Sequence, residues 1–272
     1  MSRRRWSMAT SWLMLLLASP AALAGQSCGQ SELDATELMQ ALELAEQTRQ
    51  RLLQANASSA IIARVGQDLS GYGLRYSHLG LVYQTSPGQY QVLHELNECG
   101  TARSGLYREG LGNFLLDDVF AFEILLLLPP AAVQPRLQQL LQSEQALQAH
   151  HPAYNMLAYP FDLTYQNSNQ WGLELLATLL SPTALPHRQA VQHWLQQQQY
   201  RPGVIEVDPL SRLGASVFRA NVSFTEHPLS QRLKGRYQVV TVESVQAFLQ
   251  QQWPELQPEV LKLPPMRPVQ TP

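Results

Sequence analysis

The run Tyr76-Ser77-His78-Leu79-Gly80-Leu81-Val82-Tyr83, followed after a turn by Gln91-Val92-Leu93-His94-Glu95, decides the fold that we expect for this chain. Thr85-Ser86-Pro87-Gly88-Gln89 supplies the turn residues between the two runs, so the pattern predicts a β-hairpin. The hairpin places His78 and His94 on neighbouring strands. Because imidazole changes protonation near neutral pH, two facing histidines would form the oriented base that acyl transfer requires. Taken singly, each histidine is better explained as a structural strand residue, and only their joint placement on the hairpin favours a site.

Helical patterns and further strands flank the hairpin. Apolar residues recur at helical spacing over Glu32–Ala55 and Ser168–Leu180, and Val119–Leu128 is a strongly apolar strand. Asn97–Asp118 contains four glycines and many polar residues, which indicates a long irregular loop of the kind that often lines a site. We therefore expect an α+β fold in which a small antiparallel sheet packs against helices.

Composition bounds the number of domains and the classes of partner. The chain has 272 residues, of which 45% are hydrophobic and 15% charged, so one sizeable core is expected over residues 25–256. Residues 257–272 are rich in proline and are predicted to be disordered. No apolar run after the N-terminal segment reaches the roughly 20 residues of a membrane span. No cofactor is indicated.

The N-terminal segment, residues 1–24, reads as a secretory signal. Arg3, Arg4 and Arg5 precede a short apolar core, and Ala22-Leu23-Ala24 offers small residues for cleavage. Without this segment 16 basic residues face 21 acidic ones, a formal charge of −5, which argues against sequence-independent binding of nucleic acid. We expect a periplasmic or secreted protein with no membrane span once the signal is removed.

Cys28 and Cys99 are the two cysteines of the chain. In an oxidising compartment a lone pair of cysteines by default forms a disulfide. The alternative, Cys99 as a nucleophile on the irregular loop, lacks a helix N-terminus or a basic neighbour that would lower its pKa.

The hairpin resembles the histidine hairpin of NlpC-like, papain-related hydrolases. In circularly permuted members of that superfamily the hairpin comes first, and a helix that begins with the catalytic cysteine follows later in the sequence. Here Asn167-Ser168-Asn169-Gln170-Trp171 is similar to the start of that helix, with Ser168 in the place of the cysteine. The resemblance implies a permuted papain-like fold with His78, His94 and Ser168 as candidate catalytic residues. By itself, a serine or asparagine at a helix start is more simply an N-cap.

The sequence also resembles an uncharacterised bacterial family of exported proteins (domain of unknown function 2145). The resemblance is carried by the segments Arg64–Asp68, His94–Gly100 and Tyr165–Trp171, and it implies no activity.

Two functions follow from these patterns. The first is a degenerate, non-catalytic relative that binds a cell-envelope ligand or peptide, because the family cysteine is missing. The alternative is a hydrolase or acyltransferase acting on amide or ester bonds of cell-wall peptide or lipid, in which Ser168 would lose its proton to His78. The residues expected to line the ligand cleft are Glu95, Asn167, Asn169, Trp171, Tyr76 and Tyr165. Packing in the core is the competing interpretation of the aromatic members of this set.

Metal binding has little support in the sequence. Asp117-Asp118 and His150-His151 are adjacent pairs whose side chains point in different directions, and neither has a third ligand at a metal-site spacing. We expect both pairs to be surface features and predict no metal site.

Overall fold

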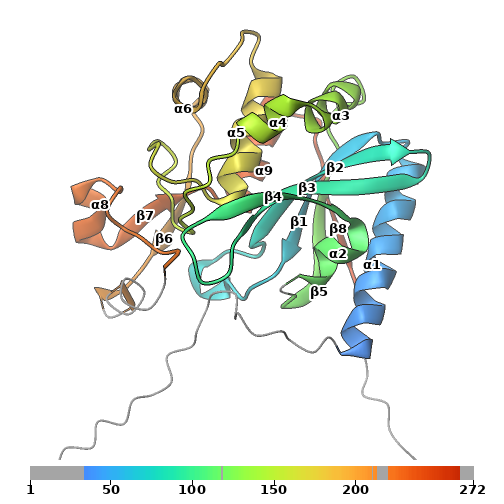
Figure 1. Cartoon of the computed structure of the whole chain (residues 1–272), viewed down its shortest axis with the longest axis horizontal. Helices are drawn as coiled ribbons and strands as arrows, with labels where there is room; N and C mark the ends of the chain where they lie inside the picture. Colours follow the sequence, from blue (N-terminus) through green and yellow to red (C-terminus); the bar gives the residue numbers. More distant parts are fainter. Residues whose placement is uncertain (1–33, 118, 210, 213–219, 264–272) are drawn as a thin grey trace, which may run out of the picture.

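A six-stranded antiparallel sheet forms the centre of the computed structural model, which describes residues 34–117, 119–209, 211–212 and 220–263 (Figure 1). Every neighbouring pair of strands is antiparallel, in the order β4-β3-β2-β1-β5-β8. The predicted α+β class with an antiparallel sheet is therefore confirmed. The strands are β1 Ser59–Val65, β2 His78–Ser86, β3 Gln89–Asn97, β4 Ser104–Gly110, β5 Ala121–Leu127 and β8 Pro258–Lys262.

The predicted hairpin is formed by β2 and β3. Leu81 pairs with Leu93 and Val82 with Val92, and the register shifts by a bulge next to the turn. Gly88 in the turn has a φ of +78°, a backbone conformation that glycine adopts without the steric cost of a side chain. The turn residues thus fix the register of the two strands.

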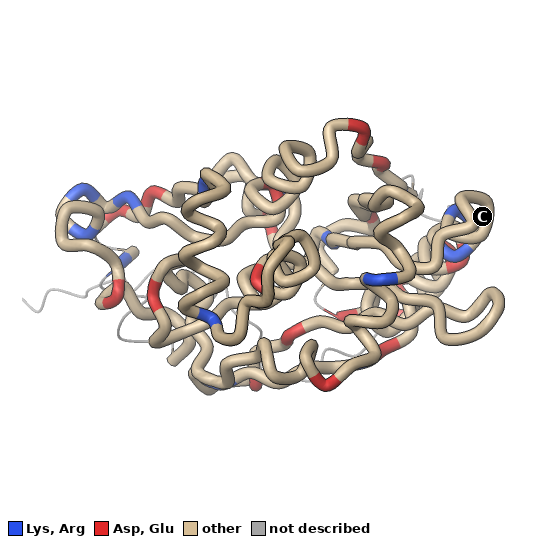
Figure 2. Tube along the Cα trace, turned by 90° about the horizontal axis from the view of Figure 1, so that it is seen from above, with Lys and Arg blue, Asp and Glu red and all other residues tan. Residues whose placement is uncertain are grey.

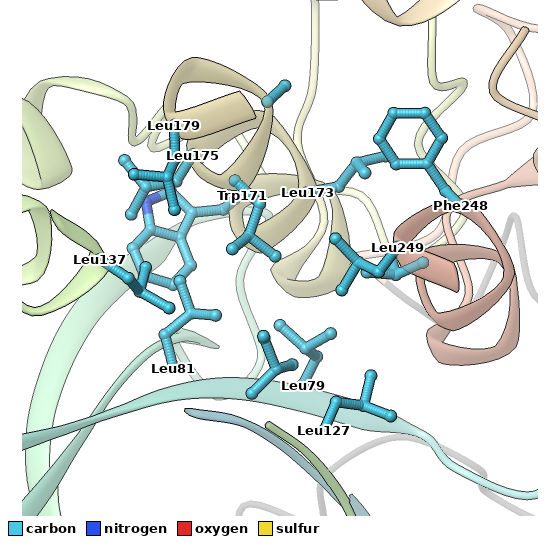
Figure 3. Close-up of a cluster of buried hydrophobic side chains, with 14 of the residues drawn as sticks. Leu79, Leu81, Leu127, Leu137, Trp171, Leu173, Leu175, Leu179, Phe248 and Leu249 are labelled. Atoms are coloured by element: carbon cyan, nitrogen blue, oxygen red, sulfur yellow. The ribbon is translucent and has the colours of Figure 1, made fainter. Parts of the chain in front are cut away.

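Helices cover both faces of the sheet and create two hydrophobic layers. Because side chains alternate along a strand, Leu79 and Leu81 of β2 lie in one layer and Val82 lies in the other. In the first layer, α5 lies directly on β2 and β3, and its side chains meet those of the sheet and of α9 (Figure 3). The helices of the first layer are α3 Gln134–Gln142, α4 Glu144–Gln148, α5 Ser168–Leu180, α6 Arg188–Gln197 and α9 Val242–Gln252, and those of the second are α1 Ala35–Gln54 and α2 Leu111–Leu116.

The central helix of the first layer, α5, begins where the sequence predicts. The side chain of Asn167 accepts a hydrogen bond of 2.8 Å from the backbone N–H of Gln170, so Asn167 is the N-cap. Gly172 faces Leu79, and a Cβ atom at Gly172 would lie 2.6 Å from Leu79 Cδ2. The missing side chain therefore allows the helix to approach β2 closely, with Trp171 fully buried beside it.

Smaller elements complete the described part of the chain. A two-stranded antiparallel sheet consists of β6 Gly203–Glu206 and β7 Arg236–Val239, and the short helix α8 Leu229–Lys234 lies against β7. A single 3₁₀ turn, η1, covers Ser70–Tyr72. No helix among the described residues is both long and apolar enough to cross a bilayer.

Two predictions about irregular segments are wrong. The segment expected to be an irregular loop, Asn97–Asp118, contains β4 and α2. β4 has no clear hydrophobic pattern in the sequence because it is an edge strand whose side chains are mostly exposed or half-buried. The predicted disorder of residues 257–272 is wrong for Pro258–Lys262, because this segment pairs with β5 as the other edge strand. Arg51 of α1 holds it with a bidentate ion pair to Glu259, at 2.5 and 2.6 Å. Residues 264–272 lie outside the described residues.

Gly80→Ala should destabilise the fold, because the new Cβ would lie 2.5 Å from Val92 Cγ1 and 2.9 Å from the ring of Phe114. Overpacking of this kind costs about 1–3 kcal/mol in the free energy of unfolding, to be measured by urea denaturation. Gly71→Ala is the matched control, since a Cβ at Gly71 would have no atom within 4 Å. Equal stability of the two variants would contradict the described packing of α2 on β2.

Candidate functional site

A row of polar side chains crosses four neighbouring strands on the face of the sheet that α1 and α2 cover. Arg64 of β1 stands opposite His78 of β2. His78 Nε2 lies 2.9 Å from His94 Nδ1 on β3, and His94 Nε2 lies 3.2 Å from Glu109 Oε2 on β4. The structure thus brings the two predicted histidines together and adds a carboxylate behind them.

The order of hydrogen bonds in this row fixes which nitrogens carry protons. A carboxylate oxygen of Glu109 accepts, so His94 donates from Nε2, and a His94 ring that carries this one proton accepts at Nδ1. His78 must then donate from Nε2, which leaves its own Nδ1 as a lone pair. The carboxylate orients one imidazole and that imidazole orients the next, as in the support of a general base.

Burial and the charge of Arg64 keep His78 uncharged. The pKa of His78 is lowered well below its ordinary value, first by burial, then by the charge of Arg64 and then by His94. The guanidinium of Arg64 donates to the carbonyl of Phe114 and, at 2.6 Å, to Asp117. Its Nε has no hydrogen-bond partner within the described parts of the chain. His78 is therefore neutral at pH 7.

Ser168 lies on the opposite side of the sheet from both imidazoles. It begins α5, which packs against Leu79, whereas His78 points to the layer of Phe114, with 5.9 Å between ring centroids. The hydroxyl of Ser168 lies beside the phenol of the buried Tyr154. The expectation that Ser168 meets His78 in one crevice is wrong, because adjacent residues of a strand face opposite ways.

The residues expected to line a ligand cleft have structural roles. Besides the cap at Asn167, the amide oxygen of Asn169 accepts from the N–H of Leu79 at 2.9 Å. Trp171 is fully buried and donates to the carbonyl of Ala146. Tyr76 is buried with its hydroxyl 3.3 Å from Glu123, and Tyr165 is half-buried. Of these residues, Asn169 joins α5 to β2 and Trp171 joins it to α4.

Glu95 forms a second polar cluster, on the α5 side of the sheet. The hydroxyl of Ser104 lies 2.6 Å from Glu95 Oε1 and 3.0 Å from His150 Nε2, so it links the carboxyl to the imidazole. Glu95 Oε2 has no partner among the described residues. Burial is the main cause that raises the pKa of Glu95 to about 8, and burial likewise lowers the pKa of His150. Glu95 is therefore mostly protonated at pH 7.

Several members of these clusters escaped the sequence analysis. Arg64 begins one of the segments that carry the family resemblance, and nothing else in the sequence indicated that Arg64 belongs to a site. Glu109 and Ser104 lie on β4, which the sequence did not reveal. His150 was expected at the surface, but its side chain is mostly buried at the end of the Glu95 cluster. Strand pairing, which joins positions far apart in the chain, was needed to find them.

Metal binding and the disulfide have different outcomes. The described residues contain no group of three histidine, cysteine or acidic side chains arranged to hold a metal ion. Cys28 lies outside the described residues, so its pairing with Cys99 stays a prediction, as does the signal at residues 1–24.

The proton positions in the histidine row can be tested by NMR of the ring nitrogens. When each ring carries a single proton, we expect that proton on Nε2 of both His78 and His94, because Glu109 accepts at the end of the row. Long-range ¹H–¹⁵N correlation spectra distinguish the tautomers, with His78→Gln and His94→Gln to assign the signals. An Nδ1–H tautomer at His94 would contradict the hydrogen-bond order given above.

Glu95→Gln should change how stability depends on pH. The folded chain holds the proton of Glu95 up to about pH 8, whereas the unfolded value is near 4.5. The stability that Glu95 contributes is thus fully present below pH 4.5 and is lost as the pH rises through 8. Relative to wild type, the variant should gain ~1.4 kcal/mol in the free energy of unfolding per pH unit within this window.

The matched control for this pH series is Glu98→Gln, since Glu98 is an exposed residue that follows β3 by one position. Its difference from wild type should stay constant over the same range. Parallel stability curves for wild type and Glu95→Gln would show that Glu95 is ionised in the folded chain.

Comparisons with known proteins place the chain in a family. Searches of curated proteins and of solved structures gave no match. Residues 51–249, which include both polar clusters and α5, match the family described as uncharacterized protein conserved in bacteria. The chain therefore belongs to the bacterial family DUF2145.

Proposed function

We propose that this protein is a non-catalytic, permuted papain-like domain that binds a ligand or peptide of the bacterial cell envelope. One observation carries the non-catalytic part: the sheet separates the Ser168 hydroxyl from both imidazoles of the histidine row. A serine hydroxyl has a high pKa and needs an adjacent base to act as a nucleophile. On its own side of the sheet Ser168 instead meets the phenol of Tyr154, which the nearby Glu95 makes still harder to ionise.

The environment of Ser168 further supports binding without chemistry. Tyr154 is buried, and the pKa of its phenol is raised by burial and by Glu95, so it stays protonated. A protonated phenol donates a hydrogen bond but cannot remove a proton. The N-terminal amides of α5 are also occupied in part, because Asn167 caps the N–H of Gln170. Among the contacts described, Ser168 has no base beside it, and the cap occupies one of the amides at the start of the helix.

The envelope location follows from residues 1–24, whose basic segment, apolar core and small residues have the pattern of an export signal. The papain-like assignment is supported by the order of the elements: the β2–β3 hairpin with its two histidines precedes a buried helix with an Asn-Ser start. An exported domain of this kind would meet cell-wall peptide, glycan or lipid before other partners.

A second candidate function is hydrolysis or acyl transfer at amide or ester bonds. The Glu109–His94–His78 row favours it, because a carboxylate and an imidazole orient the lone pair at His78 Nδ1. Since Ser168 faces the other layer, such a reaction would need water or a hydroxyl of the substrate as nucleophile. His78 would then be the general base.

Incubation with purified muropeptides separates these functions. Equilibrium dialysis measures binding, and mass spectrometry of the same samples detects new products. We expect retention of muropeptide without turnover, because the hydroxyl of Ser168 and the imidazole of His78 lie on opposite faces of the sheet. Ser168→Ala and His78→Gln should bind as the wild type does.

Each other pattern of products has a distinct meaning. Products that disappear only in His78→Gln would establish the second candidate function. Products that also disappear in Ser168→Ala would show that the serine acts as a nucleophile after all. Absence of both binding and products would rule out muropeptides as the envelope ligand.

A further inference from the structure

The short helix α8 turns its apolar side chains away from the protein. Leu229 and Leu233, one helical turn apart, are 65% and 76% exposed. The polar Gln231 between them points inward: its amide nitrogen donates to the side chain of Gln238 on β7 at 2.8 Å, and its amide oxygen accepts from the N–H of Gln238 at 3.2 Å. A surface helix ordinarily buries its apolar side and exposes its polar side, so α8 is inverted.

Helix geometry places the two leucines opposite the buried side of α8. Successive residues of an α-helix are about 100° apart, so Leu229 and Leu233 lie about 40° from each other, and the direction midway between them is about 180° from Gln231. Arg232 lies on one flank of this pair and Lys234 on the other. Since α8 is at one end of the molecule, beyond the six-stranded sheet, the leucines form a protruding apolar ridge (Figure 1).

Basic residues accompany the apolar ridge. The stretch 228–239 contains Arg232, Lys234 and Arg236 but neither aspartate nor glutamate, although the whole chain has a formal charge of −2. Arg236 is paired with Glu206 at 3.1 Å, whereas Arg232 and Lys234 form no ion pair within the described parts of the chain. Blue segments lie at the end of the trace that carries α8 (Figure 2). The ridge thus combines exposed apolar area with positive charge that has no acidic partner.

We infer that the apolar ridge of α8 docks on the surface of an anionic phospholipid bilayer, an inference that rests on the envelope location in the proposed function. Leu229 and Leu233 enter the boundary between the headgroups and the acyl chains, while Arg232 and Lys234 meet the lipid phosphates. Burial of apolar side chains and attraction to anionic headgroups add together when a helix binds at a membrane interface. The ridge supplies both contributions.

The shape and charge of the ridge favour a bilayer over two other occupants. A partner helix is commonly bound in a groove, whereas Leu229 and Leu233 protrude. In a symmetric dimer of this chain the same face would meet itself, so that Arg232 and Lys234 of the two copies would repel one another. A lipid surface accepts a protruding helix and provides negative charge.

Sedimentation of the exported chain with phospholipid vesicles tests this inference. We expect saturable binding to vesicles of equal parts phosphatidylglycerol and phosphatidylcholine. Binding should weaken about tenfold or more in Leu229→Ser/Leu233→Ser, which removes the apolar burial, and in Arg232→Gln/Lys234→Gln, which removes two positive charges. Met39→Ser is the matched control, since it removes a 68% exposed apolar side chain from α1, and it should bind as the wild type does. Pure phosphatidylcholine vesicles should bind more weakly.

The other outcomes separate this inference from the proposed function. Vesicle binding that neither α8 variant weakens would overturn α8 as the docking surface. Equal binding to phosphatidylcholine alone would overturn the anionic assignment. A dimer in sedimentation velocity that Leu229→Ser/Leu233→Ser abolishes, without vesicle binding, would assign the ridge to a second copy. Muropeptide binding is measured without lipid, so muropeptide binding without vesicle binding would overturn this inference alone, and the reverse result would contradict the proposed function alone.

Discussion

The pleat of β2 is the constraint on which the rest of the structure depends. Because successive side chains point to opposite faces, Leu79 and Leu81 must enter the layer of α5 when His78 and Val82 enter the layer of α2. A shift of the β2 register by one residue would turn the imidazole of His78 toward Gly172. It would also turn Leu79 and Leu81 toward the layer of α1 and α2. The close contact of Gly172 with Leu79, and the hydrogen bond from the N–H of Leu79 to Asn169, exclude that slip.

Separate layers mean separate polar networks. Burying a polar group is costly unless it is hydrogen-bonded. In three places the chain offsets this cost with hydrogen bonds between buried side chains. Glu109 supports the histidine row on the α2 side, and Ser104 links Glu95 to His150 on the α5 side. Within the α5 layer, the carboxylate of Glu174 accepts from Arg188 and from three glutamines, which ties α5 to α6 and to the segment before α5.

This arrangement keeps the two histidines of the hairpin apart from the hydroxyl at the start of α5. The histidines, the helix and its Asn-Ser start stand in the order that the proposed permuted papain-like fold requires, yet the hydroxyl of Ser168 lies beside Tyr154, His94 contacts Glu109 and His78 contacts His94. Each group satisfies a partner in its own layer instead of meeting the other.

The sequence by itself determined the local elements: the hairpin through its turn residues, α5 through its apolar spacing and N-cap, and the proximity of His78 to His94 through their places on paired strands. These depend on residues close together in the chain, which local periodicity and capping report. Only the tertiary structure decided that Ser168 lies across the sheet from His78, that Glu109 stands behind His94, and that Pro258–Lys262 completes the sheet. Edge strands such as β4 and β8 bury few side chains, so they leave little hydrophobic pattern, and the face on which a residue lies depends on a register that only the assembled sheet fixes.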